Sequence, residues 1–478
     1  MRDYLLIYIN GHEHQISGAD AWLTLSEYLR QRLRLTGTKI VCEEGDCGSC
    51  SVLIADLHQP KPSYYPIDSC IVFLFQLDGT QIVTIEGLSD PKELTIVQQA
   101  MIDCHGSQCG FCTPGFVMAM TGVMERQTAR DDFASNARSF DWPVELSGNL
   151  CRCTGYQPIL NACQQISNAN YQRLNSRYPM QAIQTMYAPY NVDSVRIRHR
   201  DRQIFVPRSL PECLQIKYDL PSARWVAGAT DIGVQSNKRH ASPDQAIVLR
   251  NIDALKTIED TADAITIGSA VTWTQILPYC EEHLPQFAEI INIFGSPQIR
   301  NMGTIGGNLA NASPIADSLP LLYVQESELE LASSQGTRWV NINRFYIGYK
   351  KLDLNPTEMI VRVKLPKLNL RDRLRLYKVS RRRDMDISTF TAAIRIQVES
   401  GVIQQASLAF GAVGPIVLRL PQTEGYLVGK PFSSETMAAA GEMVVDEITP
   451  ISDVRGTANY RFQLAKNVLM KFYFEESR

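Results

Sequence analysis

The sequence predicts a multidomain protein of the α+β class. Its 478 residues are enough for three or four domains of roughly 100–200 residues each. Blocks of strand-like, helical and mixed segments follow one another along the chain. Ten of the twelve cysteines lie before residue 164. A secreted protein would rarely confine its disulfides so sharply, so the distribution favours an N-terminal metal-binding region in a cytosolic protein.

The first block predicts a small sheet packed on one helix. Residues 4–9 alternate as in a strand, Gly11 marks a turn, and Ile16 starts a second strand. Apolar residues with helical spacing follow at 25–35. Strand-like runs return at 51–55 and 82–85.

The following block is helical, and the remainder is mixed. Helices are expected over residues 95–104, 114–126 and 159–167, the second with Pro114 in its first turn. Residues 172–194 are polar and show no clear period, which predicts a linker. Short strands, glycine turns and occasional helices then alternate to about Pro366. The C-terminal segments expected are strands at 374–379, 392–398 and 405–412 and helices at 433–445 and 456–474.

Composition and charge argue against two classes of protein. The chain is 45% hydrophobic and 20% charged, as in ordinary soluble proteins, and its net charge of −3 lacks the basic excess typical of nucleic-acid binding. Asp3 and Asn10 interrupt the N-terminal apolar run, so it does not read as a signal peptide. Apolar runs are far shorter than the about 20 residues of a membrane span. We expect a cytoplasmic protein without a nucleic-acid partner.

A first set of cysteines has a specific spacing. Cys42, Cys47 and Cys50 form C-x4-C-x2-C, and Cys70 follows after nineteen intervening residues. This spacing is typical of plant-type 2Fe–2S ferredoxins. Two glycines within the loop would let backbone N–H groups approach the sulfur atoms. A structural zinc site is the alternative, but it usually offers two short loops of two ligands each. We therefore expect a 2Fe–2S cluster.

A second set consists of two pairs. Cys109 and Cys112 form C-x2-C, and Cys151 and Cys153 form C-x-C after 38 intervening residues. Both pairs precede an expected helix start, where partial positive charge favours an anionic cluster. The spacing alone leaves a four-cysteine zinc site open. Four other cysteines show no partner pattern and are expected to be small buried hydrophobes: Cys104, Cys163, Cys213 and Cys280.

The residues around the second set carry a resemblance to a known family. Segments 108–115 (QCGFCTPG) and 148–156 (GNLCRCTGY) resemble the all-helical iron–sulfur domain of the molybdenum hydroxylases. That family includes xanthine dehydrogenase, aldehyde oxidase and carbon monoxide dehydrogenase. The resemblance implies a second 2Fe–2S cluster on these four cysteines, and implies that Gln108 faces the pterin of a molybdenum cofactor bound by a partner. Residues 129–146 depart from the regular helix that the family has before Gly148.

Two glycine-containing segments could bind a phosphate-bearing cofactor. In residues 225–232 (WVAGATDI) a strand enters a turn whose backbone N–H groups could cradle a pyrophosphate. Residues 301–317 (NMGTIGGNLANASPIAD) hold three glycines and end in an Asp that could bind hydroxyl groups. Most glycine-rich turns are only turns, and neither segment is the G-x-G-x-x-G fingerprint. Both, however, resemble the FAD-binding loops of the same family in order and spacing.

The resemblance implies FAD contacts within both segments and at three further positions. Phe294 stands where the family places an aromatic ring near the flavin, and Ile360 and Lys378 match further flavin contacts. The basic run at 378–383 is either a solvated turn or, by resemblance, a segment beside the flavin that attracts NAD. The implied FAD contacts are Trp225, Val226, Ala227, Gly228, Ala229, Thr230, Asp231, Ile232, Phe294, Thr304, Ile305, Gly306, Gly307, Asn308, Asp317, Ile360 and Lys378.

The resemblance covers nearly the whole chain and implies its domain order. It implies a β-grasp 2Fe–2S ferredoxin domain (1–88), a four-helix 2Fe–2S domain (89–170), a linker (171–198), a two-part α+β FAD-binding domain (199–370) and a C-terminal α/β flavoprotein domain (371–478).

The implied function is that of a small, electron-transferring subunit of the xanthine dehydrogenase type. Electrons would pass from a molybdenum cofactor on a large partner to the second cysteine set, the first set, FAD and then NAD, with O₂ left open as acceptor. The assembly would hold two small and two large subunits, and no residue of this chain would act on the organic substrate. Two alternatives remain: a sister hydroxylase that oxidises an aldehyde or N-heterocycle, and a non-catalytic scaffold stabilised by zinc.

Overall fold

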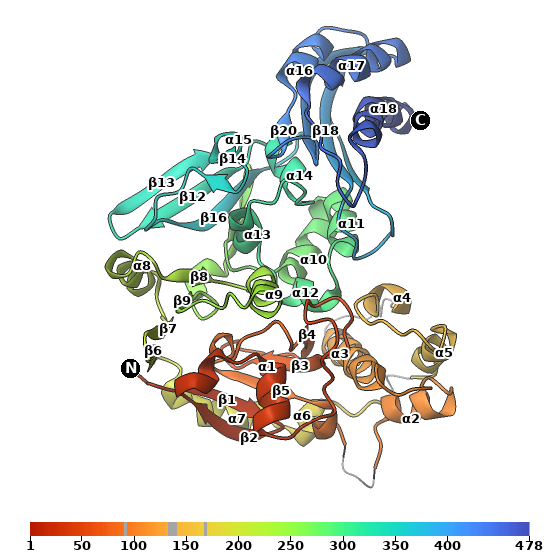
Figure 1. Cartoon of the computed structure of the whole chain (residues 1–478). Helices are drawn as coiled ribbons and strands as arrows, with labels where there is room; N and C mark the ends of the chain where they lie inside the picture. Colours follow the sequence, from red (N-terminus) through yellow and green to blue (C-terminus); the bar gives the residue numbers. More distant parts are fainter. Residues whose placement is uncertain (90–92, 132–140, 167–169, 478) are drawn as a thin grey trace. The chain divides into compact units, whose positions relative to one another are not determined.

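The computed structural model describes residues 1–89, 93–131, 141–166 and 170–477 (Figure 1). The chain forms two compact units. Unit 1 comprises Met1–Asp253 and Gly295–Gly303, and unit 2 comprises Ala254–Phe294 and Thr304–Arg478. Helices and strands are mixed in both, which confirms the predicted α+β class. Within the described ranges, no helix is long and apolar enough to span a membrane.

The first sheet of unit 1 has the order β2-β1-β5-β3-β4, with β1 and β5 parallel and the other neighbours antiparallel. Its strands are β1 Leu5–Ile9, β2 His12–Ile16, β3 Ser51–Asp56, β4 Tyr65–Asp68 and β5 Thr80–Val83. The prediction that Ile16 starts the second strand is wrong, because Ile16 ends it. The hairpin already turns at Asn10 and Gly11, which both have positive φ.

A short helix covers one face of this sheet. α1 (Leu25–Glu27) begins with a capping box at Thr24 and continues as a π-helical turn over Tyr28–Arg32. The helix predicted over 25–35 thus ends early. Arg34 has a left-handed backbone with φ of 59°, which an α-helix cannot continue through.

Four helices pack on the opposite face, where alternate residues of the strands join a second core. They are α2 Ile96–Asp103, α3 Thr113–Asp131, α4 Trp142–Glu145 and α5 Gln157–Gln165. α3 runs close over β3 and β4, since a Cβ at Gly122 would lie 2.8 Å from Pro66 Cδ and 2.9 Å from Leu53 Cδ2. Part of the irregular stretch predicted at 129–146 lies outside the described residues.

The segment predicted as a linker is largely helical, and this corrects the sequence reading. It contains α6 (Leu174–Arg177) and α7 (Met180–Tyr187). Buried residues of α7 recur at helical spacing: Met180, Ile183 and Tyr187. Polar residues between them, and the prolines Pro179 and Pro189 that flank the helix, hid this period. The next sheet begins at Val195, inside the range predicted as linker.

The second sheet of unit 1 has the order β6-β7-β9-β8, in which β7, β9 and β8 run parallel. Its strands are β6 Val195–His199, β7 Arg202–Val206, β8 Arg224–Val226 and β9 Gln245–Val248, and its helices are α8 Leu210–Asp219 and α9 Thr230–Arg239. The short helix α12 (Pro297–Met302) also belongs to unit 1. The carboxyl end of β8 leads directly into α9, and ligands of such sheets bind at carboxyl ends.

Unit 2 contains a five-stranded antiparallel sheet of order β10-β11-β16-β12-β13. Its strands are β10 Ile258–Asp260, β11 Ala264–Gly268, β12 Glu328–Ser333, β13 Gly336–Asn341 and β16 Met359–Pro366. A hairpin of β14 (Tyr346–Gly348) and β15 (Lys351–Leu352) follows α15. The helices of this part are α10 Trp273–His283, α11 Pro285–Ile293, α13 Ile305–Asn311, α14 Leu319–Val324 and α15 Ile342–Phe345.

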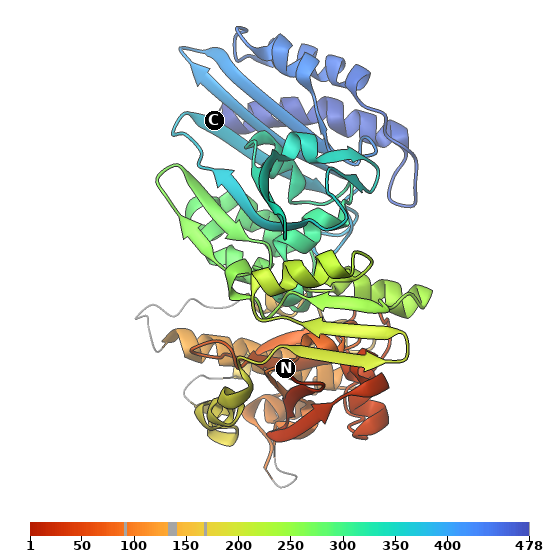
Figure 2. The ribbon, with the colours of Figure 1, turned by 90° about the vertical axis from the view of Figure 1, so that its left-hand side faces the viewer.

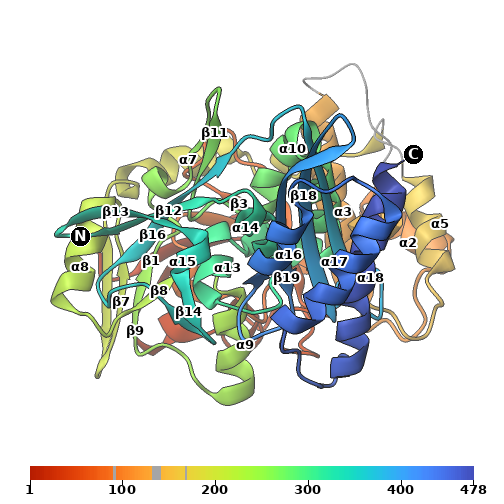
Figure 3. The same ribbon diagram turned by 90° about the horizontal axis from the view of Figure 1, so that it is seen from above.

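The C-terminal part of unit 2 is an antiparallel meander of four strands, covered on one face by helices (Figures 2 and 3). The strands are β17 Asp372–Val379, β18 Phe390–Glu399, β19 Val402–Gly411 and β20 Leu418–Arg419. The helices are α16 Pro421–Leu427, α17 Ser434–Glu447 and α18 Ala458–Glu476. Strands β17, β18 and β19 and helices α17 and α18 lie close to the ranges that the sequence predicts, whereas β20 and α16 were not predicted.

Candidate functional site

The four cysteines of the first set come together between the π-helical turn, β3 and β4. Cys42 contacts Cys47 and Cys70, and Cys70 also contacts Cys50. Cys50 and Cys70 are buried, at 2% and 3% exposure. The loop reverses sharply at residues with positive φ: Glu43 (57°), Gly45 (72°) and Gly48 (66°).

Hydrogen bonds within the first set favour one thiolate among several thiols. The pKa of Cys42 is lowered, first by hydrogen bonds from the Cys47 and Cys70 thiols and then by the backbone N–H groups of Glu44 and Asp46. Bonding to Cys42 raises the pKa of Cys47 and of Cys70 in turn. Backbone N–H groups directed at sulfur are a feature of iron–sulfur sites, and only thiolates bind the iron.

Asp68 lies beside the first set, although no sequence pattern singled it out. Its Oδ1 lies 3.6 Å from Cys50 Sγ. Its Oδ2 is buried and finds no hydrogen-bond partner among the described residues. Burial, and then the charge of Cys42, raise the pKa of Asp68 to about 7.

The four cysteines of the second set also come together, in the loops before α3 and α5. Cys153 Sγ lies 3.6 Å from Cys109 Sγ and 3.9 Å from Cys151 Sγ. Burial, and then a hydrogen bond to Cys151, raise the pKa of Cys112 to about 12. Burial also raises the pKa of Cys151, but hydrogen bonds led by Thr154 outweigh it and bring the value to about 7.

The two cysteine sets differ in exposure. Cys109, Cys153 and the neighbouring Gln108 are exposed, whereas the first set has two buried members. All-sulfur donor sets suit zinc or an iron–sulfur cluster. Within the described ranges, no three His, Cys, Asp or Glu side chains surround a position for a single metal ion.

Backbone contacts join the loops of the two sets. Leu150, the residue before Cys151, donates its N–H to the carbonyl of Cys47 at 3.0 Å. The Asn149 amide donates to Gly48 O, also at 3.0 Å. A Cβ at Gly115, in the first turn of α3, would lie 2.2 Å from Gly48 O. The ligand loops of the two sets are therefore in direct contact.

Gln298 of α12 holds both loops from the side. Its amide nitrogen donates to Asn149 Oδ1 at 2.8 Å and to Ser51 Oγ at 3.1 Å. Gln298 is 1% exposed and Asn149 is 2% exposed. No cysteine pattern points to Gln298, which lies about 150 residues further along the chain in sequence, so the sequence reading missed it.

In unit 1, the predicted segment Trp225–Ile232 forms a strand-to-helix turn. β8 ends at Val226, Ala229 adopts a left-handed backbone with φ of 56°, and α9 starts at Thr230. A Cβ at Gly228 would lie 1.9 Å from the carbonyl oxygen of Met302, so only glycine allows this approach of two backbones. The turn places the backbone N–H groups of a helix start at the carboxyl end of a parallel strand, an arrangement that can bind phosphate groups.

In unit 2, the predicted segment Thr304–Asn308 forms the start of α13. Thr304 caps the helix, accepting a hydrogen bond from Gly307 N at 3.1 Å. Gly306 packs on the backbone of Ser269, whose carbonyl accepts from Gly306 N at 2.9 Å. Gly307 is exposed, and the side-chain oxygen Oδ1 of Asn308 accepts a hydrogen bond from Ser318 Oγ at 2.6 Å.

Asp317 and Lys378, also in unit 2, bind each other. Lys378 Nζ donates to Asp317 Oδ2 at 2.7 Å, to Asp386 O at 2.9 Å and to Ser388 Oγ at 2.8 Å. Ser388 Oγ donates to Asp317 Oδ1 at 2.5 Å. The Lys378 side chain is 1% exposed, so its charge is balanced within the protein.

The two remaining predicted FAD contacts in unit 2 are apolar. Phe294 is half-buried and meets Trp273 edge to face, with ring centroids 5.0 Å apart. Ile360 lies in β16 opposite Leu331 and is 5% exposed, within the core of the sheet. Its side chain is a packing group in this arrangement.

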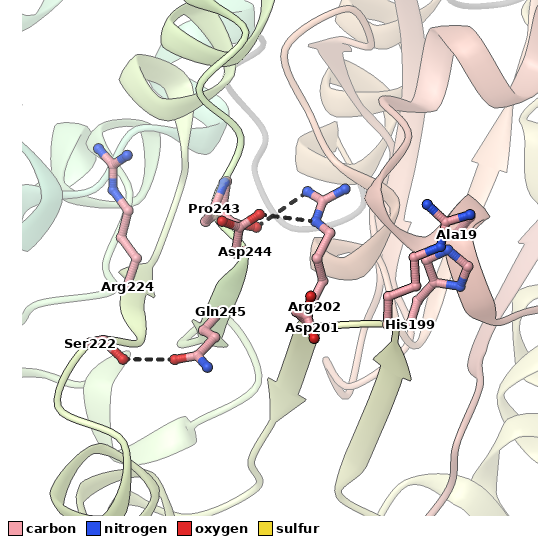
Figure 4. A pocket seen from close by; sticks show the side chains of 10 residues that line it. Ala19, His199, Asp201, Arg202, Ser222, Arg224, Pro243, Asp244 and Gln245 are labelled. Atoms are coloured by element: carbon pink, nitrogen blue, oxygen red, sulfur yellow. Dashed lines mark hydrogen bonds and ion pairs between the residues drawn. The ribbon is translucent and has the colours of Figure 1, made fainter.

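An open pocket of about 790 Å³ lies elsewhere in unit 1 (Figure 4). It is found where β7, β8 and β9 begin, whereas the predicted FAD turn follows the carboxyl end of β8. Arg202 and Asp244 face each other across it at 3.4 Å, and Ser222 donates to Gln245 at 2.8 Å. Its described lining shares no residue with the predicted site, and we assign it no role.

Family models match the chain in four consecutive parts. They are a 2Fe-2S iron-sulfur cluster binding domain (residues 7–70), a [2Fe-2S] binding domain (84–164), the FAD binding domain in molybdopterin dehydrogenase (199–368) and the CO dehydrogenase flavoprotein C-terminal domain (375–475).

Curated relatives match almost the whole chain. Xanthine dehydrogenase of Drosophila pseudoobscura pseudoobscura is 30% identical over 99% of this chain, and aldehyde oxidase 1 of Bos taurus is 29% identical over 99%. The chain spans 39% of the length of each of these relatives.

Solved structures match part of the chain. A chain of carbon monoxide dehydrogenase from Hydrogenophaga pseudoflava, lacking the Mo-pyranopterin moiety, gives a TM-score of 0.54 at 26% identity. A chain of quinoline 2-oxidoreductase from Pseudomonas putida 86 gives 0.53 at 29% identity. Each alignment covers 56% of this chain and 94% of the other. The four consecutive domains, together with these relatives, fit an iron–sulfur/FAD subunit of a molybdenum hydroxylase.

Proposed function

We propose that this chain is the electron-transfer subunit of a xanthine-dehydrogenase-like molybdenum hydroxylase. A large partner subunit would hold the molybdenum cofactor and the substrate pocket, in a heterotetramer of two small and two large subunits in the cytoplasm. Bound here, two 2Fe–2S clusters and FAD would supply one- and two-electron chemistry, with NAD as the final acceptor. The electron order is second cysteine set, first set, FAD, NAD.

The observation that carries this proposal is the contact between the two cysteine loops. Leu150 N–H donates to Cys47 O at 3.0 Å. Cys47 is a proposed ligand of the first set, and Leu150 directly precedes Cys151, a proposed ligand of the second set. A single backbone hydrogen bond therefore joins the ligand loop of one proposed cluster to the ligand loop of the other. A zinc scaffold needs no such connection, whereas electron transfer needs the two sites close together.

The exposure of the second set supports its place at the start of the route. Gln108, Cys109 and Cys153 are exposed, and the nearby Phe111 ring is 49% exposed. An exposed apolar ring beside the ligands is typical of a surface that a partner covers. We propose that the molybdenum-binding partner docks here, with Gln108 facing its pterin.

FAD is proposed to contact both glycine-containing segments. In unit 1 the contacts are Trp225–Ile232, where the helix start at Thr230 would take a phosphate. In unit 2 they are Phe294, Thr304–Asn308, Asp317, Ile360 and Lys378. Because the Lys378 ammonium is bound to Asp317, we propose that it orients that carboxylate and does not neutralise a phosphate.

A sister hydroxylase acting on an aldehyde or an N-heterocycle is the second candidate. The similar identities to a xanthine dehydrogenase (30%) and an aldehyde oxidase (29%) favour neither substrate. Turnover of xanthine, an aldehyde and quinoline by the complex with its partner, with NAD or O₂ as acceptor, separates the candidates.

Cys109→Ser tests the electron order. In the purified complex, the variant should lose most substrate-to-NAD turnover while keeping NADH oxidation by an artificial dye, which needs only NAD and FAD. Cys104→Ser is the matched control, because Cys104 lies in the same domain and no hydrogen bond joins its thiol to either set within the described residues. Equal loss of both activities in folded, FAD-loaded Cys109→Ser protein would overturn the order.

A further inference from the structure

Helix α9 connects the predicted FAD turn with the first cysteine set. It starts at Thr230, directly after Gly228 and Ala229, and its last turn contains Asn237 and Lys238. Its ten residues span about 15 Å at 1.5 Å per residue. All of the contacts described below lie within unit 1.

The end of α9 is hydrogen-bonded to the loops that carry the cysteines. Asn237 Nδ2 donates to Glu43 O at 3.0 Å and to Cys70 O at 2.8 Å. One amide thus joins the loop of Cys42 to that of Cys70. Lys238 Nζ donates to Cys42 O at 2.6 Å.

Lys238 is the cation that these contacts place against the first set. Its carboxylate neighbour is Glu44, at 3.6 Å, and both side chains are nearly half exposed, at 44% and 47%. Such an exposed pair contributes little energy. The contact to Cys42 O holds the ammonium at the ligand residue itself.

Several carboxyl groups also lie in and beside the ligand loops of the first set. Besides the thiolates, its neighbourhood holds these acidic residues: Glu43, Glu44, Asp46 and Asp68. The carboxyl end of a helix adds partial negative charge. Reduction brings one more electron to this site without making or breaking a bond, so a fixed cation nearby favours the reduced form.

We propose that Lys238 raises the reduction potential of the cluster on Cys42, Cys47, Cys50 and Cys70, and that Asn237 positions its ligand loops. The proposal rests on the proposed function, because it requires a 2Fe–2S cluster on these cysteines. It makes α9 the element that both starts at the flavin turn and sets how readily the first cluster accepts an electron.

The test is a reductive titration of the complete chain. The electron paramagnetic resonance signals of the two clusters report how much of each cluster is reduced. In Lys238→Gln, the ratio of reduced to oxidised first cluster at a fixed ambient potential should fall about three- to tenfold. A tenfold fall corresponds to a decrease of about 59 mV in the reduction potential for one electron. The second cluster should be unchanged. Lys238→Arg should restore the ratio, and its recovery would exclude a merely structural effect.

Arg239→Gln is the matched control. It removes the same charge one residue further along, and within the described part of the chain Arg239 makes no hydrogen bond or ion pair to the cysteine loops. Equal shifts in both Gln variants, or an unchanged first cluster in Lys238→Gln, would overturn the proposal for Lys238.

A second variant tests Asn237. Asn237→Leu should speed the loss of the first cluster's absorbance in air several-fold and leave the second cluster intact, and an unchanged rate would overturn its positioning role. Wild-type protein without iron would overturn the proposed function itself, which is a different outcome from intact clusters with unshifted potentials.

Discussion

Gly228→Ala tests whether the turn after β8 binds FAD. The added Cβ would lie 1.9 Å from Met302 O, 2.7 Å from Met302 C and 3.1 Å from Gly303 Cα. All three are backbone atoms, and non-bonded carbons prefer about 3.5–4.0 Å. The two backbones must therefore separate by about 1 Å or more. Overpacking of this kind typically costs about 1–3 kcal/mol.

If FAD requires the undistorted turn, this cost appears as lost affinity. A penalty of about 1–3 kcal/mol corresponds to about a 5- to 150-fold increase in the dissociation constant of FAD. Fluorescence titration of flavin-free protein measures the constant, and the iron content reports whether the cysteine domains are intact. Gly425→Ala is the control, because nothing lies within 4 Å of a Cβ at this exposed position of α16. Unchanged FAD affinity in Gly228→Ala would refute the assignment of the turn.

Two further predictions concern stability. Asp78 is fully buried and paired with two arginines, so Asp78→Asn should lower the free energy of unfolding in urea by about 3–5 kcal/mol. Asp20 lies in an exposed ion pair, so Asp20→Asn should lower it by only about 0–1 kcal/mol. Equal effects of the two substitutions would contradict this. The hydrogen bond from Arg338 lowers the pKa of Glu358 to about 2. Because the unfolded value is about 4.3, this stabilisation is present above pH of about 4.3 and is lost as the pH falls towards 2. Arg338→Met should therefore lower the melting temperature at pH 7, with a difference from wild type that shrinks towards pH 2; a pH-independent difference would contradict the assignment.

Local sequence signals predicted the elements that local chemistry determines. The strands at Leu5–Ile9 and Ser51–Asp56 lie where the strand-like runs place them, and the helix Ile96–Asp103 lies within the predicted range 95–104. The cysteine spacing likewise predicted which sulfur atoms come together, since a short loop leaves few other arrangements. Their ligation of iron stays a prediction.

Features that depend on distant partners were not predictable from the sequence. Helix α7 was read as linker because its apolar face is short and is stabilised by packing on another part of the chain. Asn149 and Gln298 are hydrogen-bonded although about 150 residues separate them in the sequence. Asn237 is hydrogen-bonded to Cys70 over a similar sequence separation. The ion pair of Asp317 with Lys378 changed the expected role of that lysine, because the sequence cannot show which carboxylate faces it.

The binding of two 2Fe–2S clusters and FAD by this chain can be measured on a single sample. The visible absorption spectrum of the purified chain, prepared anaerobically, is recorded with iron, zinc and flavin assays on the same sample. We expect about four irons and one FAD per chain, two irons for each cluster, and a red-brown spectrum that dithionite bleaches. A colourless protein loaded with zinc would contradict this expectation and would leave the cysteine sets a purely structural role.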